Sequence, residues 1–293
     1  MRFTKMHGCG NDYVYVDGGK EHIKPEQKPA LSRFVSDRHF GIGSDGLIFI
    51  NPVDDPDIDF EMEMYNADGS RSEMCGNGIR CVAKYVYDHR LTDKKNLTIV
   101  SAGQKKYIDL TVDDKNLVTS VRVDMGAPIL TPELVPVSVP SSEEKIISYP
   151  IEAAGRTWNM TCVSMGNPHA VVFLDEKDSL ADFPIEEIGP KFENHPFFPR
   201  RTNTEFVHVD NRNEVHMRVW ERGTGETLAC GTGCCATTVA SILNGHTDSR
   251  VTVHVLGGEV ICSWDGDPAS SVIMEGPATT VFEGDIDITS LSL

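Results

Sequence analysis

The second half of the chain repeats landmarks of the first half in the same order, so the candidate folds are those built from two similar units. Met74-Cys75-Gly76-Asn77-Gly78 corresponds to Ala229-Cys230-Gly231-Thr232-Gly233, and a Gly-Asn pair followed by alternating apolar residues stands ahead of each. Asn66 and Glu221 precede their cysteines by the same number of residues. Several matches in one order indicate a duplicated unit, and 293 residues suffice for two ordinary domains.

Each unit is predicted to contain several strands and one helix. Short β-branched or aromatic segments bounded by Gly, Asp or Asn predict strands at 12–17, 47–50, 59–65, 97–101, 106–112, 118–124, 214–220, 251–256, 259–264 and 271–275. Apolar residues recur with helical period after Cys75, and small or apolar residues cover every side of the segment after Cys230. We therefore predict an α+β fold with mixed sheets, in which the Pro-rich stretch 128–150 connects the two units.

The charge balance bears on the possible partners. Lys and Arg number 27 against 44 Asp and Glu, which gives a net charge of −17, and the basic runs are only two residues long. Such a chain repels phosphate backbones and anionic lipid. No stretch approaches the ~20 apolar residues of a membrane span, and the N-terminus lacks a secretory apolar core. We expect a cytoplasmic protein that binds neither nucleic acid nor membrane.

The cysteines do not form a metal or disulfide pattern. The chain has eight cysteines and no Cys-x-x-Cys pair, so neither a zinc ribbon nor a thioredoxin-like motif is predicted, and we expect no metal. A glycine loop at Gly41–Gly46 fits G-x-G-x-x-G, but a predicted strand rather than a helix follows it, and no Walker lysine follows any glycine loop. Nucleotide binding is therefore not favoured.

Cys75 and Cys230 each stand immediately before a predicted helix. Free backbone N–H donors and the positive end of the helix dipole lower the pKa of a thiol at such a place, and the following glycines let the same donors approach a carboxylate. At one such site the glycines could simply shape a strand-to-helix turn. Two sites at equivalent places in a duplicated unit favour a function, because related halves would bring two cysteines to face each other across a cleft.

Two opposed acid/base groups of the same kind suit the inversion of a carbon by proton transfer. One thiolate removes the α-proton from one face while one thiol delivers a proton to the other, and the reverse reaction only exchanges their protonation states. Donors from both helix starts, directed at the carboxylate where negative charge accumulates, would stabilise the carbanion.

Motifs along most of the chain resemble those of diaminopimelate epimerases. The matching blocks are Met6–Tyr13, Asp37–Gly46, Tyr65–Ser70, Met74–Cys81, Met165–Ala170, Asn203–Val207, Glu221–Gly233 and Gly276–Ala278 with Val281-Phe282. They occur in order from residue 6 to residue 282 and are highly specific. At Gly46 the chain departs from members that carry Gln, which makes a side-chain contact with substrate doubtful there.

The resemblance implies an isomerase that needs no cofactor and interconverts LL- and meso-2,6-diaminoheptanedioate, in lysine and peptidoglycan-precursor synthesis. It implies two pseudo-symmetric domains, each a mixed sheet wrapped around a central helix, and commonly a homodimer. The last strand returns to the first domain in that fold. We therefore expect an N-terminal half of residues 1–127 with 278–293, and a C-terminal half of residues 128–277.

Site residues follow from the resemblance motif by motif. Cys75 and Cys230 are the implied acid/base pair, and His169 with Glu221 would tune them. Glu221 would also hold the α-ammonium group. The implied substrate-binding residues are Asn11, Asn66, Asn167, Asn203 and Arg222, together with the backbone amides of Gly76, Asn77, Gly231 and Thr232.

Three alternatives remain open at this stage. A proline or hydroxyproline racemase shares the fold and the two-cysteine logic, but such enzymes usually carry His at the position of Asn77. A cysteine-based redox or metal-binding module is a second alternative, and it predicts bound zinc or iron. A non-catalytic small-molecule binding protein is the third. Turnover of substrate by a metal-free preparation separates the predicted epimerase from both of the last two.

Overall fold

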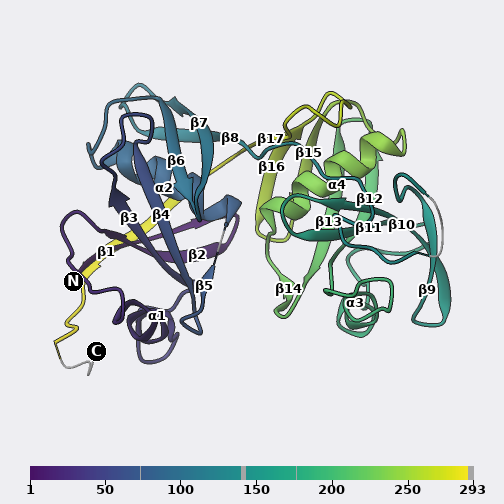
Figure 1. Ribbon diagram of the computed structural model, residues 1–293, viewed down its shortest axis with the longest axis horizontal. Helices are drawn as coiled ribbons and strands as arrows, with labels where there is room; N and C mark the ends of the chain where they lie inside the picture. Colours follow the sequence, from purple (N-terminus) through teal and green to yellow (C-terminus); the bar gives the residue numbers. More distant parts are fainter. Residues whose placement is uncertain (73, 140–142, 176, 290–293) are drawn as a thin grey trace. The chain divides into compact units, whose positions relative to one another are not determined.

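The computed structural model describes residues 1–72, 74–139, 143–175 and 177–289, and it divides the chain into two compact units. Unit 1 comprises Met1–Val123 with Gly276–Leu293, and unit 2 comprises Asp124–Glu275 (Figure 1). Residues 290–293 of the expected returning segment lie outside the described residues. Within the described ranges, no helix has both the length and the apolar composition needed to cross a membrane.

Unit 1 packs a mixed sheet around the helix that follows Cys75. Strand β2 pairs with β3 in parallel, β3 with β4 antiparallel, and β4 with β6 in parallel, while β6, β7 and β8 form an antiparallel meander. Helix α2 contacts β1, β2, β6 and β7. The elements are β1 Arg2–Gly8, β2 Asn11–Asp17, α1 Lys28–Ser36, β3 Gly46–Pro52, β4 Phe60–Asn66, β5 Arg71–Ser72, α2 Gly76–Asp88, β6 Asn96–Ser101, β7 Gln104–Val112, β8 Val118–Asp124 and β18 Thr279–Asp285.

Unit 2 has the same order of pairings. Strand β11 pairs with β12 in parallel, β12 with β13 antiparallel, and β13 with β15 in parallel. Helix α4, which follows Cys230, contacts β10, β11, β12, β15 and β16. The elements are β9 Tyr149–Ala153, β10 Arg156–Ser164, β11 Pro168–Phe173, α3 Ile185–Glu193, β12 Asn203–Asn211, β13 Glu214–Glu221, β14 Gly225–Thr227, α4 Gly231–Leu243, β15 Arg250–Val255, β16 Gly258–Ser263 and β17 Ile273–Gly276.

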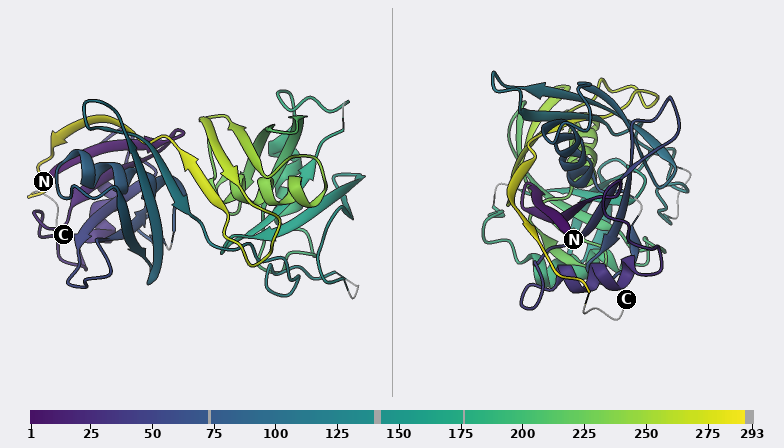
Figure 2. Two further views of the ribbon diagram at one scale, coloured as in Figure 1. Left: turned by 90° about the horizontal axis from the view of Figure 1, so that it is seen from above. Right: turned by 90° about the vertical axis from the view of Figure 1, so that its left-hand side faces the viewer.

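Strand β18 closes unit 1 from the far end of the chain. It lies antiparallel to β1, which β2 flanks on its other edge, and Figure 2 shows β18 in yellow beside β1 in purple. Phe3 of β1 and Phe282 of β18 meet edge to face, with ring centroids 5.9 Å apart. Such aromatic pairs add ~1 kcal/mol beyond their buried area.

The predicted fold class is confirmed: the chain is α+β, with a mixed sheet around a central helix in each unit. The predicted strands of both halves appear, with ends shifted by a few residues. Helices α1 and α3 were not predicted. Pro190 inside α3 and Gly189 beside it argue against a helix, yet tertiary packing requires the glycine, because a Cβ there would lie 2.4 Å from Trp220.

The Pro-rich stretch 128–150 lies within unit 2, except that 140–142 are outside the described residues. Val135, Val137 and Ile146 are buried in the core of that unit, together with Trp158. The proline pattern therefore marks a segment that packs on unit 2, whereas we expected a connection between the units.

Candidate active site

Cys75 and Cys230 are the N-cap residues of α2 and α4, as the sequence predicts. Both have extended backbone angles, and each precedes a helix of 13 residues. Because the first turn of a helix leaves backbone N–H groups without helical partners, each sulfur lies where donors and the helix dipole favour negative charge. In α2 the Gly78 N–H donates to the Cys75 sulfur at 3.3 Å.

Three of the predicted site residues meet in unit 1. The Cys75 thiol donates to the Asn11 side-chain oxygen at 3.2 Å, and the Asn77 amide donates to the same oxygen at 3.4 Å. Asn77 is in turn fixed by Arg80, which is fully buried and donates to its side-chain oxygen at 2.9 Å. The first helical turn, Asn11 and Cys75 thus form one connected group.

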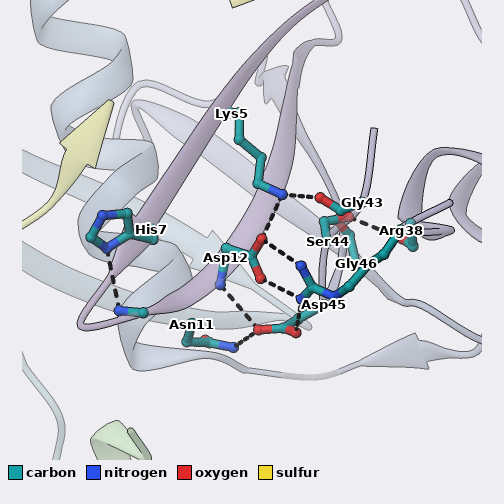
Figure 3. Close-up of polar contacts among 11 residues, drawn as sticks. Lys5, His7, Asn11, Asp12, Arg38, Gly43, Ser44, Asp45 and Gly46 are labelled. Carbon is teal, nitrogen blue, oxygen red and sulfur yellow. Dashed lines mark hydrogen bonds and ion pairs between the residues drawn. The ribbon is translucent and has the colours of Figure 1, made fainter. Parts of the chain in front are cut away.

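Asn11 is held by a charged network beside it, which Figure 3 shows. Its amide nitrogen donates to Asp45 at 2.8 Å, and Asp45 also accepts from the backbone N–H of Asp12 at 3.0 Å. Arg38 bridges the two carboxylates at 2.8 and 2.9 Å, and Lys5 pairs with Asp12 at 2.5 Å. Burial disfavours the charged form of Asp12, but Arg38 and Lys5 outweigh burial and hold the pKa of Asp12 below its usual range.

Asn66 and Gly46 are directly opposite each other on β4 and β3. The Asn66 amide donates to the Ser70 hydroxyl at 2.9 Å. A Cβ at Gly46 would lie 2.2 Å from the Tyr65 carbonyl oxygen, which explains why a side chain is absent there.

The surroundings of Cys230 differ from those of Cys75. Its sulfur lies 3.4 Å from the Thr232 hydroxyl. Burial first, and then the carboxylates of Glu221 and Glu205, raise the pKa of Cys230 well above its usual range, while Thr232 acts in the opposite direction. Burial and the two carboxylates thus favour the thiol form of Cys230, whereas its place before α4 alone predicted a lowered pKa.

His169 on β11 is fully buried between two polar groups. Its Nδ1 lies 2.7 Å from Glu205 Oε1, and its Nε2 lies 3.0 Å from the Asn167 side-chain oxygen. The structure thus brings His169 and Asn167 together, as their common motif suggests, and adds Glu205, which we did not predict. An acidic residue directly before the apolar pair Phe206-Val207 of a buried strand was the available signal.

The remaining predicted residues of unit 2 lie at the ends of β12 and β13. The backbone N–H of Arg222 donates to the Asn203 side-chain oxygen at 2.8 Å, and the Arg222 guanidinium donates to the Arg200 carbonyl at 3.1 Å. Glu221 accepts from the Thr227 hydroxyl at 2.5 Å. The Arg222 side chain is exposed, so its guanidinium is accessible to an anion.

Asp45 is the second residue that sequence reasoning missed. It lies in the glycine loop Gly41–Gly46, which matches the family motif but was assigned no site residue, and it orients Asn11 through the contact described above. The strand predicted after that loop is confirmed as β3. Over the part of the chain that the structure describes, no three His, Cys, Asp or Glu side chains come together in a way that could hold a metal ion.

Comparison with known proteins defines the fold class first. A probable proline racemase from Agrobacterium radiobacter superimposes with a TM-score of 0.73 at 14% sequence identity, over 99% of this chain and 94% of that one. The fold is therefore that of the racemases and epimerases with two similar units.

Sequence comparison defines the family. The diaminopimelate epimerase family model matches residues 3–131 and 161–281. A diaminopimelate epimerase from Agathobacter rectalis is 57% identical, over 98% of this chain and 100% of that protein, and one from Methanococcus maripaludis is 52% identical over 98% and 100%. The chain belongs to the diaminopimelate epimerase family and is an isomerase.

Proposed function

We propose that this enzyme interconverts LL- and meso-2,6-diaminoheptanedioate by moving a proton between Cys75 and Cys230, without a cofactor. One observation carries the proposal: in a member of this family, a cysteine caps each of two equivalent helices, at the positive ends of their dipoles. Inversion needs one base and one acid of similar strength, because the reverse reaction exchanges their roles.

In the proposed reaction, a thiolate takes the α-proton from one face of the carbon and the other thiol gives a proton to the opposite face. The electron pair left on the α-carbon delocalises into the adjacent carboxylate. The backbone N–H groups of Gly76-Asn77 and Gly231-Thr232 are the donors assigned to that carboxylate, because the first turn of each helix has N–H groups without helical partners.

The other end of the substrate carries an ammonium and a carboxylate group. We assign the distal carboxylate to Arg222, whose planar guanidinium can donate two parallel hydrogen bonds, and the polar groups of that arm to Asn66, Asn167 and Asn203. Asn11 contacts both Cys75 and Asn77 and therefore lines the reacting end. Glu221 is assigned to the α-ammonium group.

We further propose two functional halves of the enzyme, 1–127 with 278–293 and 128–277, with bounds a few residues from those of the two units. A homodimer in the cytoplasm, acting on a small molecule and not on nucleic acid or membrane, fits the family and the net charge of −17. The likeness to a proline racemase concerns the fold alone, so it does not extend the proposal to cyclic substrates.

The test is incubation of the purified protein with LL-diaminopimelate in heavy water, without added cofactor. We expect meso product that carries deuterium at one α-carbon. Turnover that requires pyridoxal phosphate or a metal, or product formed without deuterium, would contradict the mechanism. Inversion of proline in place of diaminopimelate would contradict the substrate.

A further inference from the structure

The two units allow a direct comparison of the residues around their cysteines. Asn11 and Tyr13 of β2 correspond to Asn167, directly before β11, and His169 of β11, since each pair follows its glycine at the same spacing. Tyr13 is opposite Gly46 of β3, and His169 is opposite Asn203 of β12. Ile48 lies two residues after Gly46 on β3, and Glu205 lies two residues after Asn203 on β12.

Ile48 and Glu205 also take equivalent positions relative to the helices α2 and α4. A Cβ built on Gly78 of α2 would lie 2.9 Å from Ile48 and 3.5 Å from the Cys75 sulfur. A Cβ built on Gly233 of α4 would lie 2.7 Å from Glu205 Oε1 and 3.3 Å from the Cys230 sulfur. An apolar side chain thus occupies in unit 1 the place that a carboxylate occupies in unit 2.

A carboxylate at this position is costly. Glu205 is fully buried. Its Oε1 lies 2.7 Å from Nδ1 of His169, which is also fully buried. Its Oε2 has no hydrogen-bond partner among the described residues. Burying a charged or polar atom without a full set of partners costs free energy. Because unit 1 builds the same strand-helix contact with Ile48, the fold does not require this acid.

The Glu205 carboxylate acts on the sulfurs nearest to it. Gly233 has no side chain, so nothing from that residue separates Oε1 from the Cys230 sulfur. Burial first, and then Glu205, raise the pKa of Cys162 on β10, and Glu205 acts in the same direction on Cys230. The charge of Glu205 therefore influences both thiols in the same direction.

We propose that Glu205 is a positioning residue of the Cys230 half of the site: its buried carboxylate, held by His169, lies across Gly233 from the Cys230 sulfur and disfavours negative charge on that sulfur. This inference rests on the proposed function: a two-cysteine epimerase needs one thiol and one thiolate before substrate binds, and Glu205 would help to set which cysteine is the thiol. In unit 1 the apolar Ile48 takes the equivalent place against α2.

Other charged and titratable groups also face Cys230. Glu221 at the end of β13 acts in the same direction as Glu205, and Cys235 on α4 is electrostatically linked to Cys230. His169 on β11 acts through its hydrogen bond to Glu205. Removing the Glu205 charge should therefore lower the pH at which Cys230 ionises, whereas removing His169 should raise it, because the carboxylate then loses its donor.

The experiment measures the ionisation of Cys230 in the full chain, without substrate. In a Cys75→Ala background, the rate of alkylation at Cys230 is followed against pH by peptide mapping, with thiolate ultraviolet absorbance as a second readout. Glu205→Gln should move the midpoint to lower pH and raise the rate near pH 8 about threefold, since the gain in thiolate is partly offset by its weaker nucleophilicity. Glu205→Ile, which copies Ile48, should act in the same direction.

Two further variants make the result specific. His169→Asn should move the Cys230 midpoint to higher pH, and this opposite sign is not expected from a loss of packing. Thr204→Val changes the adjacent buried residue of the same strand and should leave the midpoint unchanged. An unchanged midpoint in both folded Glu205 variants would overturn the proposal, and so would shifts of the same sign for His169→Asn and Glu205→Gln.

The alkylation experiment tests the role of Glu205 independently of the proposed epimerase function. Alkylation needs no substrate, so a shift of the Cys230 midpoint supports the role of Glu205 even if diaminopimelate is not turned over. Conversely, epimerase activity in the wild-type chain together with an unshifted midpoint would retain the function and reject the role of Glu205.

Discussion

The Cys75 thiol donates a hydrogen bond to the side-chain oxygen of Asn11 at 3.2 Å. The same sulfur accepts from the Gly78 N–H at 3.3 Å. One neighbour therefore suits the thiol and the other suits the thiolate, which fits a group that alternates between the two forms. At Cys230 the Thr232 hydroxyl, which can donate or accept, serves both forms with one group.

The orientation of Asn11 depends on Asp45, because that carboxylate accepts from the Asn11 amide nitrogen. Asp45→Asn places an N–H₂ group where the carboxylate was and should turn the Asn11 oxygen away from Cys75. We expect kcat/KM to fall on the order of tenfold to a hundredfold, a range typical of misplaced catalytic groups. Asp37→Asn is the control in the same loop: the Asp37 carboxylate accepts from the backbone N–H groups of His39 and Phe40, and the variant should keep wild-type activity. Equal effects of the two variants would refute the orienting role.

Removing one cysteine should leave a one-sided catalyst. In Cys75→Ala the remaining thiol exchanges only the hydrogen on its own face, and inversion should fall drastically, while Cys230→Ala should show the opposite stereochemical preference. Because the two groups act as a unit, the double variant should be scarcely slower than either single one. Deuterium uptake into LL- and meso-substrate, measured separately beside the inversion rate, tests this. Near-normal inversion by either single variant would rule out the two-base mechanism.

Arg222→Ala should lower kcat/KM about a hundredfold, because a distal carboxylate would lose a charged, two-point partner. The backbone N–H of Arg222 still bonds Asn203 in the variant, so the fold should persist. Arg212→Ala is the matched control: Arg212 forms an exposed ion pair with Asp248, and such pairs contribute little. Steady-state kinetics with circular dichroism provide the measurement. Arg222→Ala with the activity of Arg212→Ala would refute the assignment.

Glu63 gives unit 1 a pH-dependent contribution to stability. Burial raises the pKa of Glu63, but hydrogen bonds from Lys28, Tyr65 and Asn51 outweigh burial, so its folded pKa lies below the usual value. A depressed carboxyl pKa stabilises the fold above the unfolded pKa and ceases to do so as the pH falls through the folded value. The contribution is therefore complete at neutral pH and is lost below about pH 4.

Glu63→Gln should consequently reduce the free energy of unfolding by about 3 kcal/mol at pH 7, since it leaves the buried Lys28 without its counter-charge. The difference from wild type should shrink as the pH approaches 3. Urea unfolding at several pH values measures it. Asp109→Asn, which breaks the exposed pair with Arg122, should change stability little at any of these pH values. A Glu63→Gln deficit that does not change with pH would show that the charge is not its cause.

The sequence was sufficient to predict the repeated unit, most strands and both cysteine-capped helices. These features depend on local patterns: small apolar residues cover all of α4, and glycines follow each cysteine. Helix α3 escaped prediction because Pro190 and Gly189 disfavour a helix locally, while packing against Trp220 imposes one. Strand β1 was also missed, since Lys5 interrupts its apolar pattern and becomes buried only by pairing with Asp12.

Only the site residues that lie within recognisable motifs could be predicted from the sequence. The motifs name Asn11, Cys75 and His169, but the partners that fix them lie far away along the chain. Asp45 reaches Asn11 through the pairing of β2 with β3, and Glu205 reaches His169 through the pairing of β11 with β12. Strand register in three dimensions determines these contacts, and no local spacing encodes it.

The pairing of β1 with β18 has a consequence for how the protein is made. The ribosome produces β1 and β2 first, but β18 emerges only after all of unit 2. Throughout that interval one edge of β1 has no partner, and an open strand edge is a template for pairing with another nascent chain. Unit 2 can therefore mature before unit 1, which reverses the usual N-terminal-first order of folding during translation. The early half of the polypeptide is therefore the part whose strand edge stays open longest during synthesis.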